Sequence, residues 1–276
     1  MPIVTLITDF GNKDYSVAAV KGAIVSTVQS PQVIDISHQI EPYNVTQAAY
    51  VLKNAYKTFP KGSIHIVGVE SEKTPENDHL AMFFDGHYFI GADNGIFSII
   101  KGVFKAEKIV TINIHNQSAF VFPVLDTFIK VAAHLSRSGA LEVIGKTADQ
   151  IRELVELRPV VNLTGDQVVG SVIYVDNYGN VITNITRKLF NEIGKSRGFT
   201  IFARNIKFRK VFEAYSDAID FNIPKEKRDE DGKKIALFND ADHLELAIYK
   251  SNPQSVGSAY SLFGLEYRDS VTVKFE

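Results

Sequence analysis

Two polar clusters in this 276-residue sequence have residue types suited to ligand chemistry. The first is Thr8-Asp9-Phe10-Gly11, which directly follows the mostly apolar segment from Ile3 to Ile7. Ligands of open α/β sheets bind in the crevice at the carboxyl ends of the strands, so Asp9 is placed to accept two hydrogen bonds from a ribose diol. An aspartate at this point also serves to organise a turn. The position of Asp9 alone leaves both interpretations open.

The second cluster runs from Val175 to Asn184 and reads Val-Asp-Asn-Tyr-Gly-Asn-Val-Ile-Thr-Asn. It places a carboxylate, an aromatic ring and several amides in one turn between two expected strands. Such a turn can stack on a purine and hydrogen-bond to its edge. The same composition is typical of an ordinary hairpin, because Asn, Asp and Gly are frequent in turns.

The sequence lacks the residues that several other kinds of site chemistry require. The absence of cysteine excludes disulfides, thiolate catalysis and cysteine-ligated zinc. The histidines show no spacing such as His-Glu-x-x-His, so we predict no metal site. The sequence contains neither a Gly-x-Gly-x-x-Gly loop nor a Walker-type loop, which argues against NAD and ATP, and we predict no cofactor.

Charge and hydropathy narrow the class of partner. The 30 basic and 32 acidic residues nearly cancel, which removes the usual electrostatic reason to expect a nucleic acid or an anionic membrane as partner. The chain reaches Asp9 too early for the apolar region of a signal peptide, and no apolar run approaches the length of a membrane span. We therefore expect a cytoplasmic protein that binds a small molecule.

The first half of the sequence predicts an N-terminal α/β domain over residues 1–158. Short β-branched runs alternate with amphipathic stretches, which is typical of crossover units on a largely parallel sheet. The charged stretch 70–78 is expected to be a loop, because it is polar and contains Pro75. Strands are expected at 3–7, 33–36, 64–69, 80–84 and 88–90, and helices after Asp14, after Asn44 and around 128–135.

The second half predicts a C-terminal β-rich domain, a small barrel or sandwich, over residues 166–276. The segment from Arg158 to Asp166 has the Pro and Gly content of a hinge. Beyond it, strands separated by tight turns are expected at 168–175, 181–185, 200–203, 206–208, 235–238, 244–248 and 270–275.

Taken together, these clusters resemble the S-adenosylmethionine hydroxide adenosyltransferases, a family that also includes fluorinases and chlorinases. The resemblance spans nearly the whole chain. It implies an α/β domain, a β-rich domain, and a homotrimer that binds S-adenosylmethionine between domains of neighbouring subunits. The motifs that carry it are Thr8 to Gly11 with Asp14 and Lys21-Gly22, Asp35 to His38 with Tyr43, Asp93-Asn94-Gly95, Asp176 to Asn184, Leu244 to Ile248 and Gly257-Ser258-Ala259.

The resemblance also implies roles for individual residues. Asp9 is similar to the carboxylate that holds the ribose hydroxyls, and Tyr43 to an aromatic residue placed against the ligand. Asp176 is similar to the residue that meets the methionine ammonium. Tyr178 would pack on adenine, and Asn180 would read an adenine edge.

The catalytic part departs from the family pattern. Hydrolytic members have Val-Asp-Pro-Gly-Val-Gly followed by an arginine, and later His-Gly-Arg-Asp, which together position the attacking water. Here Val69 is followed by Glu70, Asn77 stands about where the arginine is expected, and Pro123 lies in the segment that replaces the histidine. The Tyr, Thr and Ser of the halogenase pocket are also missing. The resemblance thus implies a degenerate Asp-Arg-His triad with Glu70 as the candidate base, although a solvated charged loop explains the same stretch.

Three functions remain open on these residues. The first is a hydrolase that forms adenosine and L-methionine by attack of water at ribose C5′ of S-adenosylmethionine. Because neutral methionine leaves a sulfonium without help from an acid, the protein mainly orients and deprotonates the water. The second is a non-catalytic binder or sensor of S-adenosylmethionine or adenosine. The third is a site for another nucleoside, whose 5′ substituent fits the rebuilt 70–78 loop.

Overall fold

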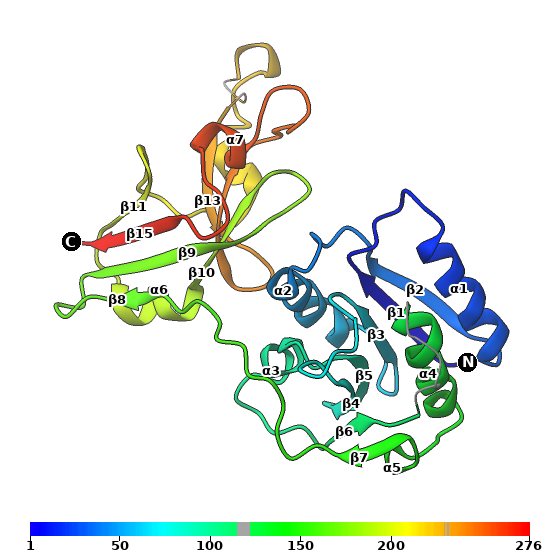
Figure 1. Cartoon of the computed structure of the whole chain (residues 1–276). Coiled ribbons are helices and arrows are strands. Elements are labelled where there is room, and N and C mark those ends of the chain that lie inside the picture. The colour runs from blue at the N-terminus through cyan, green and yellow to red at the C-terminus, as the bar shows by residue number, and fades with distance from the viewer. Residues whose placement is uncertain (115–121, 229, 231) are drawn as a thin grey trace. The chain divides into compact units, whose positions relative to one another are not determined.

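The computed structural model describes residues 1–114, 122–228, 230 and 232–276. The chain divides into two compact units, Met1–Glu156 (unit 1) and Leu157–Glu276 (unit 2), and each unit has its own sheet (Figure 1). Unit 1 carries an α/β arrangement, and unit 2 is built mainly from antiparallel strands. Among the helices of the described residues, none combines the length and hydropathy that a membrane crossing requires.

Unit 1 contains a mixed sheet with the described strand order β2-β1-β3-β5-β4-β6-β7. Strands β1, β2, β3 and β5 pair in parallel, whereas β4, β6 and β7 are joined by antiparallel pairings. The expected largely parallel sheet is thus only half present, because the turn at Asp85-Gly86 folds β5 back against β4. The strands are β1 (Ile3–Thr8), β2 (Gln32–Ser37), β3 (Ile64–Gly68), β4 (His79–Phe84), β5 (His87–Ala92), β6 (Lys108–Ile112) and β7 (Gly145–Thr147).

Helices flank this sheet. The N-cap predicted at Asn44 is present, since its side chain accepts the N–H of Gln47. Asp14 lies one residue before the cap position of α1, and its carboxylate accepts the N–H of Ser16 instead. The helical segments are α1 (Ser16–Thr27), α2 (Val45–Ala55), a 3₁₀ turn (Tyr56–Thr58), α3 (Ile96–Lys101), a π-helical turn (Val124–Phe128), α4 (Ile129–Ser136) and α5 (Leu141–Ile144).

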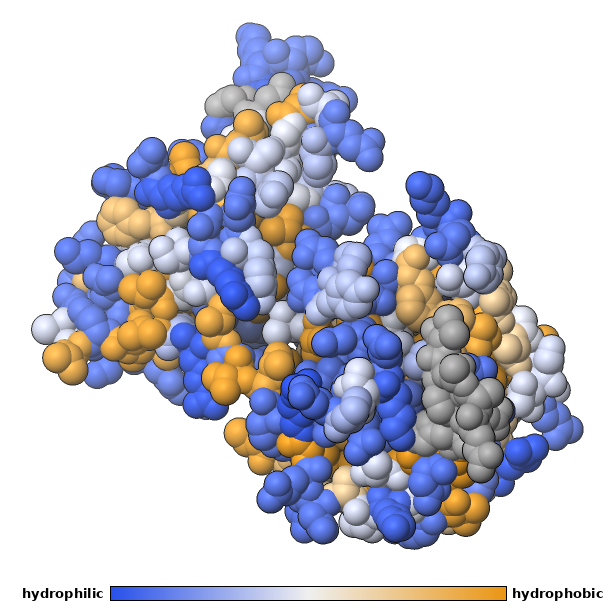
Figure 2. All heavy atoms as spheres, in the orientation of Figure 1, coloured by the Kyte–Doolittle hydropathy of each residue, from blue (hydrophilic) through white to orange (hydrophobic). Residues whose placement is uncertain are grey.

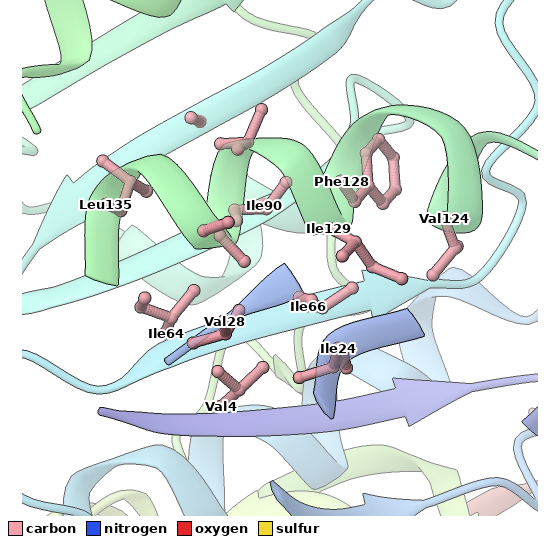
Figure 3. Close-up of a cluster of buried hydrophobic side chains, with 14 of the residues drawn as sticks. Val4, Ile24, Val28, Ile64, Ile66, Ile90, Val124, Phe128, Ile129 and Leu135 are labelled. Carbon is pink, nitrogen blue, oxygen red and sulfur yellow. The ribbon is translucent and has the colours of Figure 1, made fainter. Parts of the chain in front are cut away.

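Apolar side chains fill both faces of the sheet. On one face, Phe128 and Ile129 pack with Ile66 of β3 and Val4 of β1 (Figure 3). On the other face, residues of α2 and α3 such as Leu52 pack with a second buried cluster. Hydrophilic residues predominate on the face of the molecule drawn in Figure 2. Burial on both faces explains why β1 and β3 are mostly apolar, with Thr5 and Thr8 in β1 and His65 in β3 as the polar residues.

Unit 2 is a barrel-like sheet with the described order β12-β11-β15-β9-β10-β14-β13, with β8 paired to β9. The first and last strands of this path, β12 and β13, approach each other. Each predicted strand of this unit is present, with bounds that differ by at most one residue. Its segments are β8 (Val160–Val161), β9 (Gln167–Val175), β10 (Val181–Thr186), α6 (Arg187–Gly194), β11 (Phe199–Ala203), β12 (Ile206–Phe208), 3₁₀ turns (Tyr215–Ala218 and Lys225–Lys227), β13 (Lys234–Phe238), β14 (His243–Ile248), α7 (Ala259–Phe263) and β15 (Ser270–Phe275).

A buried histidine pair lies inside the sheet of unit 1. His65 Nδ1 is 2.7 Å from the Thr5 hydroxyl, and His65 Nε2 is 3.2 Å from His87 Nδ1. The His65 ring stacks on Phe89 with centroids 4.9 Å apart. Burial lowers the pKa of His65 to about 3, and the neighbouring His87 adds to this effect. Burial also lowers the pKa of His87.

Acid is expected to destabilise the protein through His65. Its pKa is 6.5 without the fold and about 3 within it, so the unfolded chain binds more protons between these values. The resulting stability is complete above pH 6.5 and is lost as the pH falls towards 3. We expect the free energy of unfolding to drop by roughly 2–3 kcal/mol at about pH 4.5 through this group.

Urea unfolding of the full chain at neutral and acid pH measures this dependence. In His65→Gln the difference between the two pH values becomes smaller, whereas the control His134→Gln, with a partly exposed ring, keeps the wild-type difference. An unchanged pH dependence in His65→Gln would show that the buried imidazole is not the titrating group.

Candidate functional site

A pocket of about 990 Å³ opens at the loops that follow the parallel strands β1, β2 and β3. Three residues singled out in the sequence, Asp9, Tyr43 and Glu70, line it together. The full lining comprises Asp9, Phe10, Pro42, Tyr43, Glu70, Ser71, Glu72, Thr74, Glu76, Asn77, Phe122, Pro123 and Arg152.

Asp9 directly follows β1 and is held by a backbone hydrogen bond from a distant loop. Its Oδ2 accepts the N–H of Tyr43 at 2.9 Å. Tyr43 has a φ of 64°, an unusual value for a non-glycine residue, and its side chain is 74 % exposed. A carboxylate has about four lone-pair sites, so Asp9 keeps acceptors for ligand hydroxyls while it organises the loop.

A chain of polar contacts fixes the strand ends beside Asp9. The Thr8 hydroxyl is 2.8 Å from His38 Nδ1, and His38 Nε2 is 3.1 Å from Asp35 Oδ1. The Lys21 ammonium lies 2.5 Å from Asp35 Oδ2. Burial acts to raise the pKa of Asp35, but hydrogen bonds from Lys21 and His38 outweigh it and hold that pKa below its usual range. Each ring nitrogen of His38 therefore lies close to a polar side chain.

The charged stretch 70–78 is an ordered turn. Glu70 has a φ of 43°, and its side chain and that of Glu72 are exposed. The side-chain amide of Asn77 donates to the carbonyls of Glu72 at 3.0 Å and Glu70 at 3.4 Å. Thr74 and Asn77 also exchange two backbone hydrogen bonds. The loop thus presents its carboxylates from a backbone that is fixed internally.

Asn77 and Pro123 occupy the positions where the resemblance leads one to expect an arginine and a histidine. Asn77 is 7 % exposed, and its Oδ1 has no hydrogen-bond partner among the described residues. Pro123 is buried at the start of the π-helical turn, next to Phe122, whose ring meets that of Phe10 edge-on with centroids 5.1 Å apart. Neither residue contributes a charge to the pocket.

Arg152 supplies a positive charge that the sequence did not reveal. It lies in the irregular segment before the end of unit 1, where no periodicity marks it. Its backbone N–H donates to Asp93 Oδ1 at 2.8 Å, and Arg152 is one of the residues that line the pocket. Burial raises the pKa of Asp93, and the hydrogen bond and charge of Arg152 oppose that rise.

The second cluster forms the turn between β9 and β10 in unit 2. Asp176 Oδ1 accepts the N–H groups of Tyr178 and Asn180, both at 2.8 Å, and Oδ2 accepts the Asn180 side chain at 2.9 Å. Tyr178 is 65 % exposed, whereas Asn180 is 5 % exposed. The structure therefore brings Asp176, Tyr178 and Asn180 together, as a turn whose carboxylate is its organising group.

Glu245, on β14, is a buried carboxylate within the Leu244 to Ile248 motif, and the sequence pattern gave it no role of its own. It is 3 % exposed, and it accepts hydrogen bonds from the Tyr215 hydroxyl and from Asn239 Nδ2. Burial raises its pKa, and the charge of Asp176 adds to the rise. In the described residues, no group of three or more His, Cys, Asp or Glu side chains is arranged to hold a metal ion.

Known proteins match both units. The model of the S-adenosylmethionine hydroxide adenosyltransferase N-terminal domain matches residues 4–145, and that of the C-terminal domain matches residues 170–272. A protein named (R)-S-adenosyl-L-methionine hydrolase from Methanocaldococcus jannaschii is 26 % identical over 99 % of this chain and 96 % of its own. One of the same name from Thermus thermophilus is 25 % identical over 95 % and 96 %. A crystal structure of an uncharacterized conserved protein from Thermotoga maritima has a TM-score of 0.82 at 26 % identity, with 99 % of both chains covered.

Gly179 is expected to be essential for the turn in unit 2. It has a φ of +72°, and a Cβ there would lie 2.2 Å from Ser258 Oγ and 2.4 Å from Ser258 Cβ. Gly179→Ala should lower the free energy of unfolding by roughly 2–4 kcal/mol, because strain and overlap add. The matched control is Gly165→Ala, with a φ of +65° and no atom within 4 Å of the new Cβ.

Gly165→Ala should cost only about 1 kcal/mol from the backbone conformation. Urea denaturation of both variants and wild type gives the comparison. Equal destabilisation by the two substitutions would contradict the close packing of the turn against Ser258.

Proposed function

We propose, since this chain belongs to the S-adenosylmethionine hydroxide adenosyltransferase family, that it hydrolyses S-adenosyl-L-methionine to adenosine and L-methionine. Proteins named as hydrolases of this substrate align with almost the full chain. The observation in this chain that carries the proposal is one pocket that brings Asp9, whose carboxylate accepts the Tyr43 N–H, together with Glu70; Glu72 and Glu76 also line it.

Asp9 is proposed to hold the ribose. The 2′ and 3′ hydroxyls of the ribose are donors, and a carboxylate accepts both without competing for their oxygens. The Tyr43 N–H fixes one Asp9 oxygen at 2.9 Å, so the carboxylate is oriented before a ligand arrives. This preorganisation lowers the entropic cost of binding.

Glu70 is proposed as the base that accepts a proton from the attacking water. The water oxygen forms a bond to ribose C5′, the C5′–S bond breaks, and its electron pair stays on the sulfur of neutral methionine. One proton of the water moves to the base, and the other remains on the 5′-hydroxyl of adenosine. Positioned base catalysis contributes about a hundred- to ten-thousand-fold, which sets the scale of what Glu70 supplies.

A second candidate function is a non-catalytic binder or sensor of S-adenosylmethionine or adenosine. It is favoured by Asn77, whose amide donors are both used on the carbonyls of its own loop. Such a residue cannot replace a cation beside the water. The homotrimer with intersubunit sites that the family resemblance implies stays a prediction.

Asp9→Asn is expected to weaken binding of S-adenosylmethionine by about 10- to 100-fold, because a charge-assisted hydrogen-bond pair to the ribose is lost. The asparagine still offers an oxygen to the Tyr43 N–H, so the loop is preserved. Isothermal titration calorimetry measures the effect. The control Asp149→Asn, an exposed aspartate outside the pocket, should bind as wild type. Unchanged affinity in Asp9→Asn would remove Asp9 from the binding site.

Glu70→Gln is expected to reduce kcat by about a hundred- to ten-thousand-fold while the affinity for S-adenosylmethionine changes little. Chromatographic detection of adenosine above the uncatalysed blank measures kcat. Glu72→Gln, in the same turn and also exposed, is the matched control and should retain turnover. Loss of turnover in Glu72→Gln with activity retained in Glu70→Gln would contradict the assignment of the base. If the wild type binds S-adenosylmethionine but releases no adenosine above the blank, the protein is instead a non-catalytic binder.

A further inference from the structure

Two buried threonines of β1 each contact a histidine, and of these two pairs one lies beside the candidate site. The Thr8 hydroxyl is 2.8 Å from His38 Nδ1, next to Asp9. The Thr5 hydroxyl is 2.7 Å from His65 Nδ1, three residues further back along the strand. Both threonines are at most 1 % exposed. Because the two contacts are chemically alike, a ligand-binding property that depends on Thr8 and not on Thr5 belongs to the site rather than to the stability of the sheet.

The charge on Asp35 sets the direction of the contacts around His38. Burial acts to raise the pKa of Asp35, but hydrogen bonds from Lys21 and His38 hold that pKa below its usual range, so the ionised carboxylate only accepts. His38 Nε2 lies 3.1 Å from Asp35 Oδ1, so in the neutral ring the proton belongs on Nε2. Nδ1 then keeps a lone pair, to which the Thr8 hydroxyl donates. The Thr8 oxygen in turn accepts the Phe10 N–H at 3.4 Å.

His38 holds the turn that carries Asp9 from both sides. Its side chain contacts Thr8, the residue before Asp9, and its backbone carbonyl accepts the Gly11 N–H at 2.8 Å. Five residues after His38, the Tyr43 N–H reaches the Asp9 carboxylate. The loop after β2 thus makes three separate contacts with the segment from Thr8 to Gly11.

Packing keeps the Thr8 side chain in its contact with His38. A Cβ added to Gly68 of β3 would lie 3.0 Å from Thr8 Cγ2 and 3.0 Å from Phe10 Cζ. The methyl group of Thr8 therefore occupies the space that a glycine leaves at the end of β3. Since threonine is branched at Cβ and has few rotamers, this packing also sets the direction of its hydroxyl.

We propose that His38 is a positioning residue for ribose binding, which acts through Thr8 on the orientation of the Asp9 carboxylate. The assignment rests on the proposed function, in which Asp9 accepts both ribose hydroxyls, and deepens it by naming the groups that set selectivity for a ribose diol. Two hydroxyls bind one carboxylate together only when its plane and position are correct, so a small rotation of the turn weakens this contact selectively. His38 itself contacts no ligand atom in this scheme.

Isothermal titration calorimetry of the full chain with adenosine and with 2′,3′-dideoxyadenosine tests the proposal. The analogue lacks both ribose hydroxyls, so it reports every contact except the one with Asp9. Thr8→Val keeps the side-chain shape without the hydroxyl, and should weaken adenosine binding by about tenfold while binding of the analogue stays the same. His38→Leu removes the same contact from its other end and should give the same pattern. Thr8→Ser keeps the hydroxyl and should bind adenosine nearly as wild type does.

Thr5→Val is the matched control. It removes the hydroxyl that contacts His65 in the same sheet, so in urea it should lower the free energy of unfolding about as much as Thr8→Val. Its affinity for adenosine should nevertheless equal that of the wild type. A second control combines Asp9→Asn with Thr8→Val. If Thr8 acts through Asp9, the added substitution causes no further loss of adenosine binding.

The outcomes separate this inference from the function on which it rests. A loss confined to adenosine, absent in Thr5→Val and in the Asp9→Asn background, supports the inference. Unchanged adenosine affinity in Thr8→Val overturns it, as does an equal loss for both ligands or an equal loss in Thr5→Val, because the hydroxyl would then act only on the fold. These results leave the proposed function standing if the wild type prefers adenosine to the analogue. A wild type without that preference overturns the ribose role of Asp9, and the inference falls with it.

Discussion

The hydrogen bond from the Tyr43 N–H to the Asp9 carboxylate joins two loops that are 34 residues apart, and the candidate site depends on it. Because β1 pairs in parallel with both β2 and β3, the loops after these strands open at one edge of the sheet. The bond fixes the loop after β1 against the segment that enters α2. It holds Tyr43 at a φ of 64°, a conformation that costs on the order of 1–3 kcal/mol and persists only where its surroundings determine it.

Two carboxylates that are proposed to bind the ligand also accept hydrogen bonds from the protein. Asp9 accepts an N–H from a loop, and Asp176 accepts three hydrogen bonds inside its own turn. The turn-forming and ligand-binding interpretations of these residues are therefore compatible, because a carboxylate that is held by N–H groups is already oriented for a ligand. The backbone of the 70–78 turn is also fixed by a polar side chain, because the side-chain amide of Asn77 donates to the carbonyls of both Glu70 and Glu72. In each case the backbone is fixed by hydrogen bonds, and carboxylate oxygens remain able to accept further hydrogen bonds.

Local sequence patterns predicted most of the helices and strands. The features that they did not predict depend mainly on contacts between residues far apart in the sequence. The alternating strands of unit 2 and the Asn44 cap were readable because their signals lie within a few residues. Helix α6 was missed although Thr186 caps it by accepting the Leu189 N–H, a local signal that the neighbouring strands obscured. The turn at Asp85-Gly86 joins β4 and β5 as a hairpin, which is a local signal, whereas the parallel pairing of β5 with β3 is a longer-range contact that periodicity does not encode. The segment that contains Arg152 is held by residues far away in the sequence. The Arg152 N–H donates to Asp93, 59 positions away, and the Leu154 N–H donates to Ser98, 56 positions away, so no local pattern marks Arg152 as a pocket residue.

The most direct test of the account is single-turnover hydrolysis of S-adenosyl-L-methionine in ¹⁸O-labelled water, with mass spectrometry of the products. Attack of water at ribose C5′ predicts adenosine that carries one labelled oxygen, in its 5′-hydroxyl, together with unlabelled methionine. Adenosine without the label, or a product in which the C5′–S bond survives, would contradict the proposed reaction.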